Sequence, residues 1–146
     1  MPIGTDPIVT YAFSVEVDGM TIAQFQEASG ISIEISVIEH KENKLGGLPI
    51  MKKLPGHVKY ADIVLKRGKV SDKDFWEWIK KVQNGDIDGA RKNGSIVIRD
   101  YSHGEKQRFN FENGWPSKVE VSGGNAKSDE VMIESVTITH EALKVG

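Results

Sequence analysis

Hydrophobic and polar residues alternate along much of the chain, and this alternation predicts β-strands. It is clearest in residues 11–17 (YAFSVEV) and 31–37 (ISIEISV), where hydrophobic side chains recur at every second position. A strand with one buried face requires this period of two. Asp18-Gly19 and Ser29-Gly30 predict turns on either side of a short strand over residues 20–25. The start of the chain therefore indicates a meander of strands.

The same alternation continues in the second half of the chain. It predicts strands over residues 95–101, around residues 109–111 and around residues 119–121. Hairpin turns fit between them at Ser102 to Lys106 and at Asn113-Gly114.

Two predicted strands depart from clean alternation. In residues 57–67 (HVKYADIVLKR) both faces carry apolar side chains, and in residues 131–140 (VMIESVTITH) the apolar parity changes between Ile133 and Val136. The second pattern fits either a β-bulge near Glu134 and Ser135 or a strand that is covered on both faces. Covering both faces of a strand requires a second sheet, which a neighbouring subunit could supply.

One segment has the period of an α-helix. Ser71 precedes it as a predicted N-cap, Asp72 and Asp74 lie in its first turn, and Gly85 ends it. Four of its side chains form a stripe that is predicted to face the core: Phe75, Trp78, Ile79 and Val82. Trp76 lies at the margin of the stripe, where it is either part of the packing or part of a stacking platform for bases or sugars.

The longest stretch without periodicity runs from about His40 to Gly56. Loops longer than about 12 to 15 residues are uncommon in compact domains unless they are functional or disordered. The predicted strand before this stretch ends at Glu39, and the strand after it begins at His57. We therefore predict the tip of a long hairpin whose apolar residues are exposed in an isolated monomer.

Length and composition restrict the class of protein. We expect 146 residues to form a single domain over residues 1–146, and 19 basic against 21 acidic residues create no strong overall field. Without cysteine the chain has no disulfide framework, no thiolate nucleophile and no cysteine-ligated metal. The start of the chain does not resemble a signal peptide, and no run of 18 apolar residues occurs. We expect a protein made in the cytoplasm that does not insert into a membrane by itself.

The sequence shows no pattern typical of a catalytic, cofactor or metal site. His40, His57, His103 and His140 have none of the spacings that place two imidazoles on one metal. G-x-S-x-G and P-loop motifs are absent, and the short basic cluster at residues 66–69 is more typical of a solvated strand edge than of a nucleic-acid site. A pair of catalytic carboxylates can be distant in the sequence and meet only in the folded protein, so the sequence does not exclude such a pair. A hydrolase of this kind therefore stays a further alternative.

Five segments resemble, in their order and spacing, the phage tail tube proteins of the T4-like type. They are KLPGHVKYADIVLKRG (53–68), DFWEWIKKVQNGD (74–86), NGSIVIRD (93–100), FENGWPSKVE (111–120) and VMIESVTITHEAL (131–143). Residues 13–40 also resemble the start of that family, so the resemblance spans nearly the whole chain. The family includes the inner tubes of phage-tail-like contractile injection systems.

The resemblance implies a structural protein and not an enzyme. The implied fold is mainly β: an antiparallel β-barrel or sandwich with one flanking α-helix and a long extended hairpin loop, similar to the type VI secretion tube protein. Six copies would form a ring, and stacked rings a hollow tube that conducts DNA or protein effectors. The implied partners are a contractile sheath, a baseplate and a tube terminator, with no cofactor. The particle is a phage tail or a contractile injection particle, extracellular or cytoplasmic, assembled in the bacterial cytoplasm.

The resemblance also implies which residues make contacts between subunits. An arm that orders on assembly and helps rings stack would comprise Gly46, Gly47, Leu48, Pro49, Ile50, Met51, Lys52, Lys53, Leu54, Pro55 and Gly56. A strand of the barrel between subunits would contain Val58, Tyr60, Ile63, Val64 and Leu65. The helix would pack on the outer side of the tube. The alternative function is a carbohydrate-binding or adhesion β-sandwich with Trp76, Trp115 and Tyr101 as sugar platforms.

Overall fold

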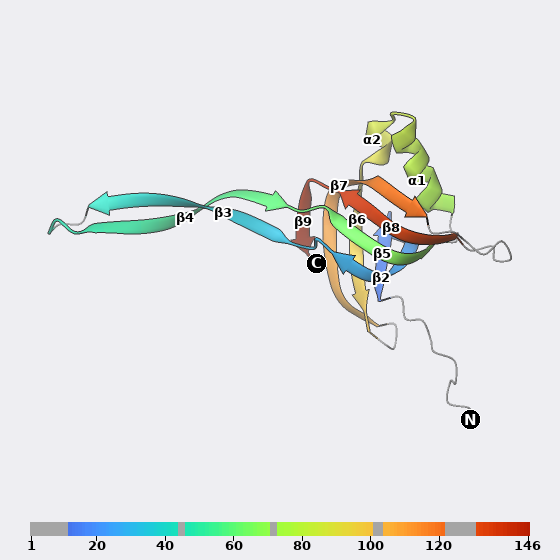
Figure 1. Ribbon diagram of the computed structural model, residues 1–146, viewed down its shortest axis with the longest axis horizontal. Helices are drawn as coiled ribbons and strands as arrows, with labels where there is room; N and C mark the ends of the chain where they lie inside the picture. The colour runs from blue at the N-terminus through green and yellow to red at the C-terminus, as the bar shows by residue number, and fades with distance from the viewer. Residues whose placement is uncertain (1–11, 44–45, 71–72, 101–103, 122–130) are drawn as a thin grey trace, which may run out of the picture.

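A computed structural model describes residues 12–43, 46–70, 73–100, 104–121 and 131–146. Seven strands form the main sheet: β1 (Phe13–Val17), β2 (Met20–Ser29), β5 (Ile63–Val70), β6 (Lys92–Arg99), β7 (Glu105–Val121), β8 (Val131–Thr139) and β9 (Ala142–Val145). A separate two-stranded sheet contains β3 (Ile33–Asn43) and β4 (Pro49–Tyr60). Two helices, α1 (Lys73–Gln83) and the short α2 (Ile87–Ala90), lie together beside the main sheet (Figure 1).

The main sheet closes on itself. Its strand order is β6-β1-β2-β5-β8-β7-β9, and β6 also pairs with β7, so six strands form a closed barrel with β9 added along β7. The pairings between described strands are all antiparallel. Closure leaves the six strands without a free edge along most of their length. The predicted antiparallel, mainly β fold with a flanking helix is confirmed, and α2 is an element that the sequence pattern did not predict.

The turn between β1 and β2 follows from its sequence. Asp18 and Gly19 both have left-handed backbone conformations, with φ of 54° and 78°. A two-residue hairpin turn of this kind matches the twist of the strands that it joins, and Asp-Gly is a preferred pair for it. The predicted turn at Asp18-Gly19 is confirmed.

The predicted turn at Asn113-Gly114 is wrong, because β7 runs through these residues. Before this point β7 pairs with β6 and β9, and after it with β8. Asn113 has φ of 51°, and a Cβ at Gly114 would lie 2.4 Å from the ring of Phe111. The pair therefore bends one long strand from one neighbour to the next instead of reversing it. The other predicted hairpin turn, at residues 102–106, falls partly outside the described residues, and within the described part Arg99 pairs with Glu105, where β7 already begins.

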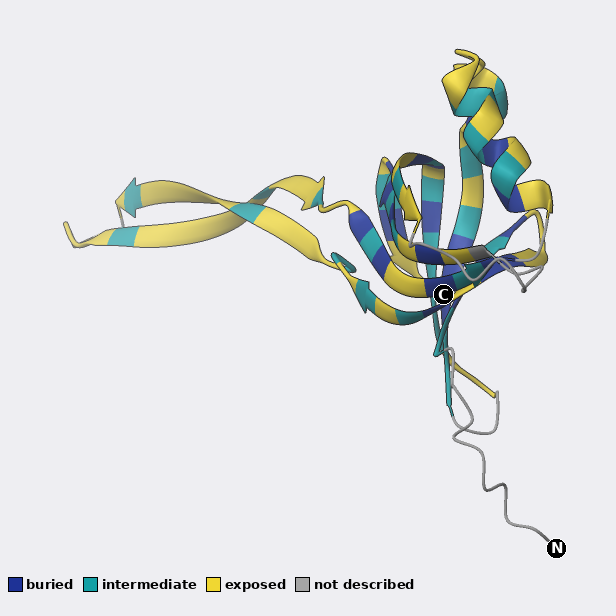
Figure 2. Cartoon of the chain, turned by 45° about the vertical axis from the view of Figure 1, so that its right-hand side comes forward, coloured by how far each residue is buried: buried dark blue, intermediate teal, exposed yellow. Residues whose placement is uncertain are grey.

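The core lies inside the barrel and beneath α1. Its fully buried side chains include Val15, Phe25, Ile63, Leu65, Ile96, Phe111, Val136 and Ile138 (Figure 2). Phe75 and Trp78 of α1 are buried in the same cluster, and Ile79 and Val82 pack against it. The predicted apolar stripe of the helix is therefore confirmed. The predicted N-cap, Ser71, lies outside the described residues.

The parity change in residues 131–140 has a cause within the barrel. Along the β7–β8 ladder Glu120 pairs with Ser135 and Val121 pairs with Ile133, so Glu134 is an extra residue. The extra residue lets Ile133, Val136 and Ile138 all point into the core. The β-bulge predicted near Glu134 and Ser135 is confirmed, and no second subunit is needed to explain the pattern.

Candidate assembly arm

β3 and β4 form a long ribbon that projects from the barrel, and we call residues 33–60 the arm (Figure 1). Its ladder runs from the Ile33–Tyr60 pair at the barrel to the Asn43–Pro49 pair near the tip. The predicted irregular stretch from His40 to Gly56 is therefore wrong in its extent. Only residues 44–48 separate the two strands. The predicted long hairpin is present, but its strands extend closer to the tip than the predicted ends at Glu39 and His57.

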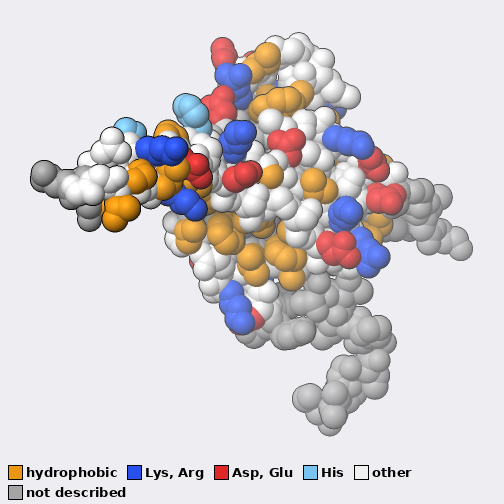
Figure 3. Space-filling model, turned by 60° about the vertical axis from the view of Figure 1, so that its left-hand side comes forward, with side chains coloured by type: hydrophobic (Ala, Val, Ile, Leu, Met, Phe, Trp, Pro, Cys, Tyr) orange, Lys and Arg blue, Asp and Glu red, His pale blue; other side chains and the backbone are white. Residues whose placement is uncertain are grey.

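The arm carries most of the exposed hydrophobic surface among the described residues. More than half of the exposed large hydrophobic side chains lie on it: Ile33, Ile35, Val37, Ile38, Leu48, Met51, Leu54 and Val58. The arm is exposed along nearly its whole length (Figure 2), and apolar side chains lie among its lysines (Figure 3). A two-stranded ribbon with this composition is marginal in water by itself. A large exposed apolar surface of this kind marks a site of protein contact.

The predicted contact residues at positions 46–56 occupy the tip of the arm and most of β4. Gly46 and Gly47 have left-handed conformations, with φ of 117° and 81°, and Leu48 is 77% exposed. The remaining residues are in β4, where Met51 and Leu54 are exposed and Ile50 is half-buried. That this segment becomes ordered only on assembly stays a prediction.

The structure divides the predicted inter-subunit strand between two sheets. Val58 and Tyr60 belong to β4, whereas Ile63, Val64 and Leu65 belong to β5. The ladder breaks at residues 61–62, because β4 pairs with β3 while β5 pairs with β2 and β8. Ile63 and Leu65 are fully buried in the core of their own chain and leave no side-chain surface for a neighbour. The prediction of one continuous strand over residues 57–67 is therefore wrong, whereas the role of these five residues in contacts between subunits stays a prediction.

Two contacts fasten the root of the arm to the barrel. Gly30 has φ of 79°, and a Cβ there would lie 1.9 Å from the carbonyl oxygen of Asp62, so only glycine fits. The buried His140 lies between two backbone carbonyls, with Nε2 3.0 Å from Ala61 O and Nδ1 3.1 Å from Ala142 O. The arm therefore leaves the barrel through a packed junction at both of its strands.

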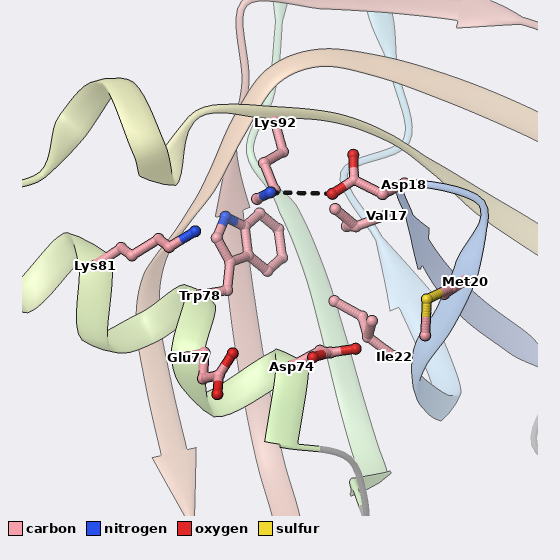
Figure 4. Close-up of a pocket in the computed structure, with 9 residues that line it drawn as sticks. All are labelled: Val17, Asp18, Met20, Ile22, Asp74, Glu77, Trp78, Lys81 and Lys92. Carbon is pink, nitrogen blue, oxygen red and sulfur yellow. Dashed lines mark hydrogen bonds and ion pairs between the residues drawn. The ribbon is translucent and has the colours of Figure 1, made fainter.

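One hollow on the barrel combines paired charges with an aromatic side chain. A hollow of about 160 Å³ lies between α1 and the β1–β2 hairpin (Figure 4). Acidic and basic side chains share its rim, and Lys92 Nζ lies 3.0 Å from Asp18 Oδ2. The indole Nε1 of Trp78, which also lines it, donates to Ala90 O. Among the described residues no group of three or more histidine, cysteine, aspartate or glutamate side chains could hold a metal ion.

Two of the three aromatic residues of the alternative sugar site, Trp76 and Trp115, lie in different surroundings. Trp76 packs edge-on against Phe75, with ring centroids 5.5 Å apart, and contributes to the core. Trp115 lines a different hollow, of about 240 Å³, with Ile87 and the end of α1. Tyr101 lies outside the described residues. The structure thus supplies no shared platform of Trp76 and Trp115.

Two ion pairs on the barrel are exposed to solvent. Lys118 Nζ lies 2.7 Å from Glu120 Oε1, and this hydrogen bond raises the pKa of Lys118 and lowers the pKa of Glu120. Arg67, in the predicted basic cluster, lies 3.6 Å from Glu27 and is mostly exposed. Exposed pairs of this kind contribute little to stability.

Comparison with known proteins identifies the family to which this barrel and arm belong. The family model described as "T4-like virus tail tube protein gp19" matches residues 9–144. The chain belongs to this tail tube family. It is therefore a structural tube protein, and the resemblance noted in the sequence is confirmed. Tail tube proteins of this kind are parts of phage tails or contractile injection particles. No curated protein sequence was found to match the chain.

Solved structures share the fold of this tail tube protein at low sequence identity. A chain of the extended sheath–tube complex of PVC, an extracellular contractile injection system, is 20% identical, with a TM-score of 0.64 and coverage of 98% of this chain and 93% of that chain. A chain of the tube-terminating cap of the anti-feeding prophage is 22% identical, with a TM-score of 0.64 and coverage of 100% and 99%. Hcp1 from Flavobacterium johnsoniae is 15% identical, with a TM-score of 0.50 and coverage of 93% and 95%.

We expect the histidines of this tail tube protein to have no role in chemistry. Replacing His40 by alanine should leave thermal stability unchanged, because this side chain is exposed, whereas the same change at His140 should cost about 1–3 kcal/mol through the loss of its contact with the backbone carbonyl of Ala61 at the arm root. Neither these substitutions nor those at His57 and His103 should abolish function through lost chemistry. A chelator should leave assembly unchanged, as measured by light scattering. Assembly that fails in EDTA and returns with added metal would contradict this expectation.

Proposed function

We propose that this protein forms hexameric rings that stack into the inner tube of a contractile phage tail or injection particle. The family match is the observation that carries the proposal. The arm supports it, because its exposed apolar side chains gain burial when they dock on another subunit, at about 25 cal/mol per Å² of apolar surface. Within the described residues, no helix is both long and apolar enough to cross a membrane.

The proposal extends to the partners of the tube. The solved structures that share the fold come from a sheath–tube complex, a sheath and tube terminator, and a baseplate. We therefore propose that this chain contacts a contractile sheath, a tube terminator and a baseplate, and that it is made and assembled in the bacterial cytoplasm. The lumen would conduct DNA or protein effectors. The subunit would act without catalysis and without a cofactor.

Electron microscopy of the purified protein tests the proposal directly. Negative-stain images should show six-fold rings, or tubes built from them, and light scattering should show a particle mass that rises with protein concentration. The fraction of assembled protein is expected to fall as the protein is diluted, because each contact between subunits is reversible. A monomer that stays monodisperse at high concentration would contradict the proposal, and so would rings of another symmetry for its hexameric part.

A further inference from the structure

The ladder of the arm contains one irregularity, which lies closer to the barrel than to the tip. Ile35 pairs with Val58, but Val37 pairs with Pro55. Between these pairs β3 contributes one residue, Ser36, and β4 contributes two, Gly56 and His57. This arrangement is a β-bulge, in which one extra residue shifts the pairing of everything beyond it.

Ser36 and Gly56 fit the bulge closely. The backbone N–H of His57, which the extra residue removes from the regular ladder, donates to Ser36 Oγ at 2.8 Å. A Cβ at Gly56 would lie 2.5 Å from the same oxygen and 3.2 Å from the carbonyl oxygen of Ser36. The hydroxyl can therefore stay on the amide only while residue 56 lacks a side chain.

The position of the extra residue decides which side chains face one another in the part of the arm beyond the bulge, residues 37–43 and 49–55. In the observed register Ile38 lies opposite Leu54 and Glu39 lies opposite Lys53. Lys52 Nζ also reaches Glu42 Oε2 at 2.9 Å. Apolar pairs and opposite charges of this kind stabilise a two-stranded sheet.

A ladder that continued beyond Ile35–Val58 without the bulge would be shifted by one residue. Glu39 would then lie opposite Leu54, and Lys41 would lie opposite Lys52, which places like charges in a direct pair. Each side chain of β4 beyond the bulge would also move to the other face of the ribbon. A neighbouring subunit would meet a different surface.

We propose that Ser36 and Gly56 are positioning residues that lock the register of the outer arm, residues 37–43 and 49–55. The lock is a property of a single chain. Its consequence for tube growth rests on the proposed function, because only in that case does another subunit bind the surface that the register creates. The two parts are therefore tested by separate measurements.

Disulfide trapping measures the register directly, since the chain contains no cysteine of its own. One variant carries Glu39→Cys with Lys53→Cys, which are directly opposite in the observed register. The other carries Glu39→Cys with Leu54→Cys, which are opposite only after a one-residue slip. Cysteines whose Cβ atoms point to opposite faces of a ribbon cannot be bridged without backbone movement. Both variants are oxidised at low protein concentration, and the intramolecular bridge is quantified by peptide mass spectrometry.

With Ser36 and Gly56 intact, we expect the 39–53 bridge to form readily and the 39–54 bridge to form only as a small, measurable fraction. Ser36→Ala or Gly56→Ala should raise the slipped 39–54 bridge, relative to 39–53, by about three- to tenfold, which is the effect of losing one hydrogen bond. Ser36→Thr keeps a hydroxyl and should behave as the parent. The double variant should match Gly56→Ala alone, because both changes remove the same contact. An unchanged bridge pattern in Ser36→Ala and Gly56→Ala would overturn the proposal.

Tube growth is then measured for Ser36→Ala without engineered cysteines. This measurement tests the proposed function independently of the register of the arm. A slipped register together with impaired growth supports both proposals. A slipped register with normal growth supports the lock and contradicts the role of the arm in stacking.

Discussion

Replacing Leu48, Met51 and Leu54 together by serine is expected to stop tube growth without affecting the stability of the free subunit. These side chains are 77%, 46% and 47% exposed on the arm. If docking buries them, their loss should cost each contact between subunits about 2–4 kcal/mol. This corresponds to about a thirtyfold to thousandfold weaker association constant, and a growing tube repeats the loss at every ring. Sedimentation of tubes and the melting temperature of unassembled subunits measure the two effects.

A matched control is available on the barrel and its β1–β2 turn. Met20, Val121 and Val145 are 53%, 53% and 65% exposed, and they lie outside the arm. Serine at these three positions removes a comparable amount of exposed apolar surface and should leave tube growth much closer to that of the parent. Equal growth by the arm variant and the parent would show that the arm surface does not act in assembly. Unfolding of the arm variant as a monomer would show instead that these side chains stabilise the subunit itself.

Gly30→Ala is expected to give the largest loss of stability among single substitutions at the arm root. The new Cβ would meet the carbonyl oxygen of Asp62 at 1.9 Å, and the residue would have to keep φ of 79°. Overpacking and left-handed strain should together cost about 2–5 kcal/mol. For a chain of this size the melting temperature should fall by about 5–15 °C, as measured by circular dichroism.

Gly19→Ala provides the control for backbone strain alone. Gly19 has nearly the same φ, 78°, but nothing lies within 4 Å of the position that its Cβ would occupy. This variant should lose only about 1 kcal/mol. Melting temperatures that fall equally in the two variants would show that contact with Asp62 is unimportant and that the junction is looser than its geometry indicates.

Elements with one buried face were predictable from the sequence, whereas the arm was predictable only in outline. β1 and α1 each bury one side in the core, so their apolar residues recur with the period of the element. Both strands of the arm are largely exposed on both faces. The alternation of Ile33, Ile35 and Val37 therefore predicts a strand correctly but a buried face wrongly, and beyond Val37 the apolar residues of the arm follow no such period. Pro49, Pro55 and Gly56 added turn signals within what is in fact β4. The family resemblance, and not periodicity, is the source of the proposal that this segment contacts other subunits.

The strand break and the long bent strand were missed for a different reason. Nothing in the side chains of residues 61–62 shows that the chain leaves one sheet and enters another, because that change depends on which strands are available as partners. Asn113-Gly114 has the composition of a hairpin turn, yet the chain uses it to bend β7 from β6 toward β8. Local sequence specifies the backbone conformation at such places. Pairing with other strands decides whether that conformation reverses the chain or only bends one strand.

The topology of the root makes the arm separable from the barrel. β2 and β5, which flank the arm in the sequence, are direct neighbours in the barrel, and Ser29 already pairs with Val64. The whole ribbon is thus an insertion into an ordinary hairpin. Evolution can lengthen, shorten or exchange it between related subunits without rebuilding the barrel, and engineers could graft a foreign ribbon at the same two points. If the arm mediates stacking as proposed, the stacking contacts can diverge while the barrel stays unchanged.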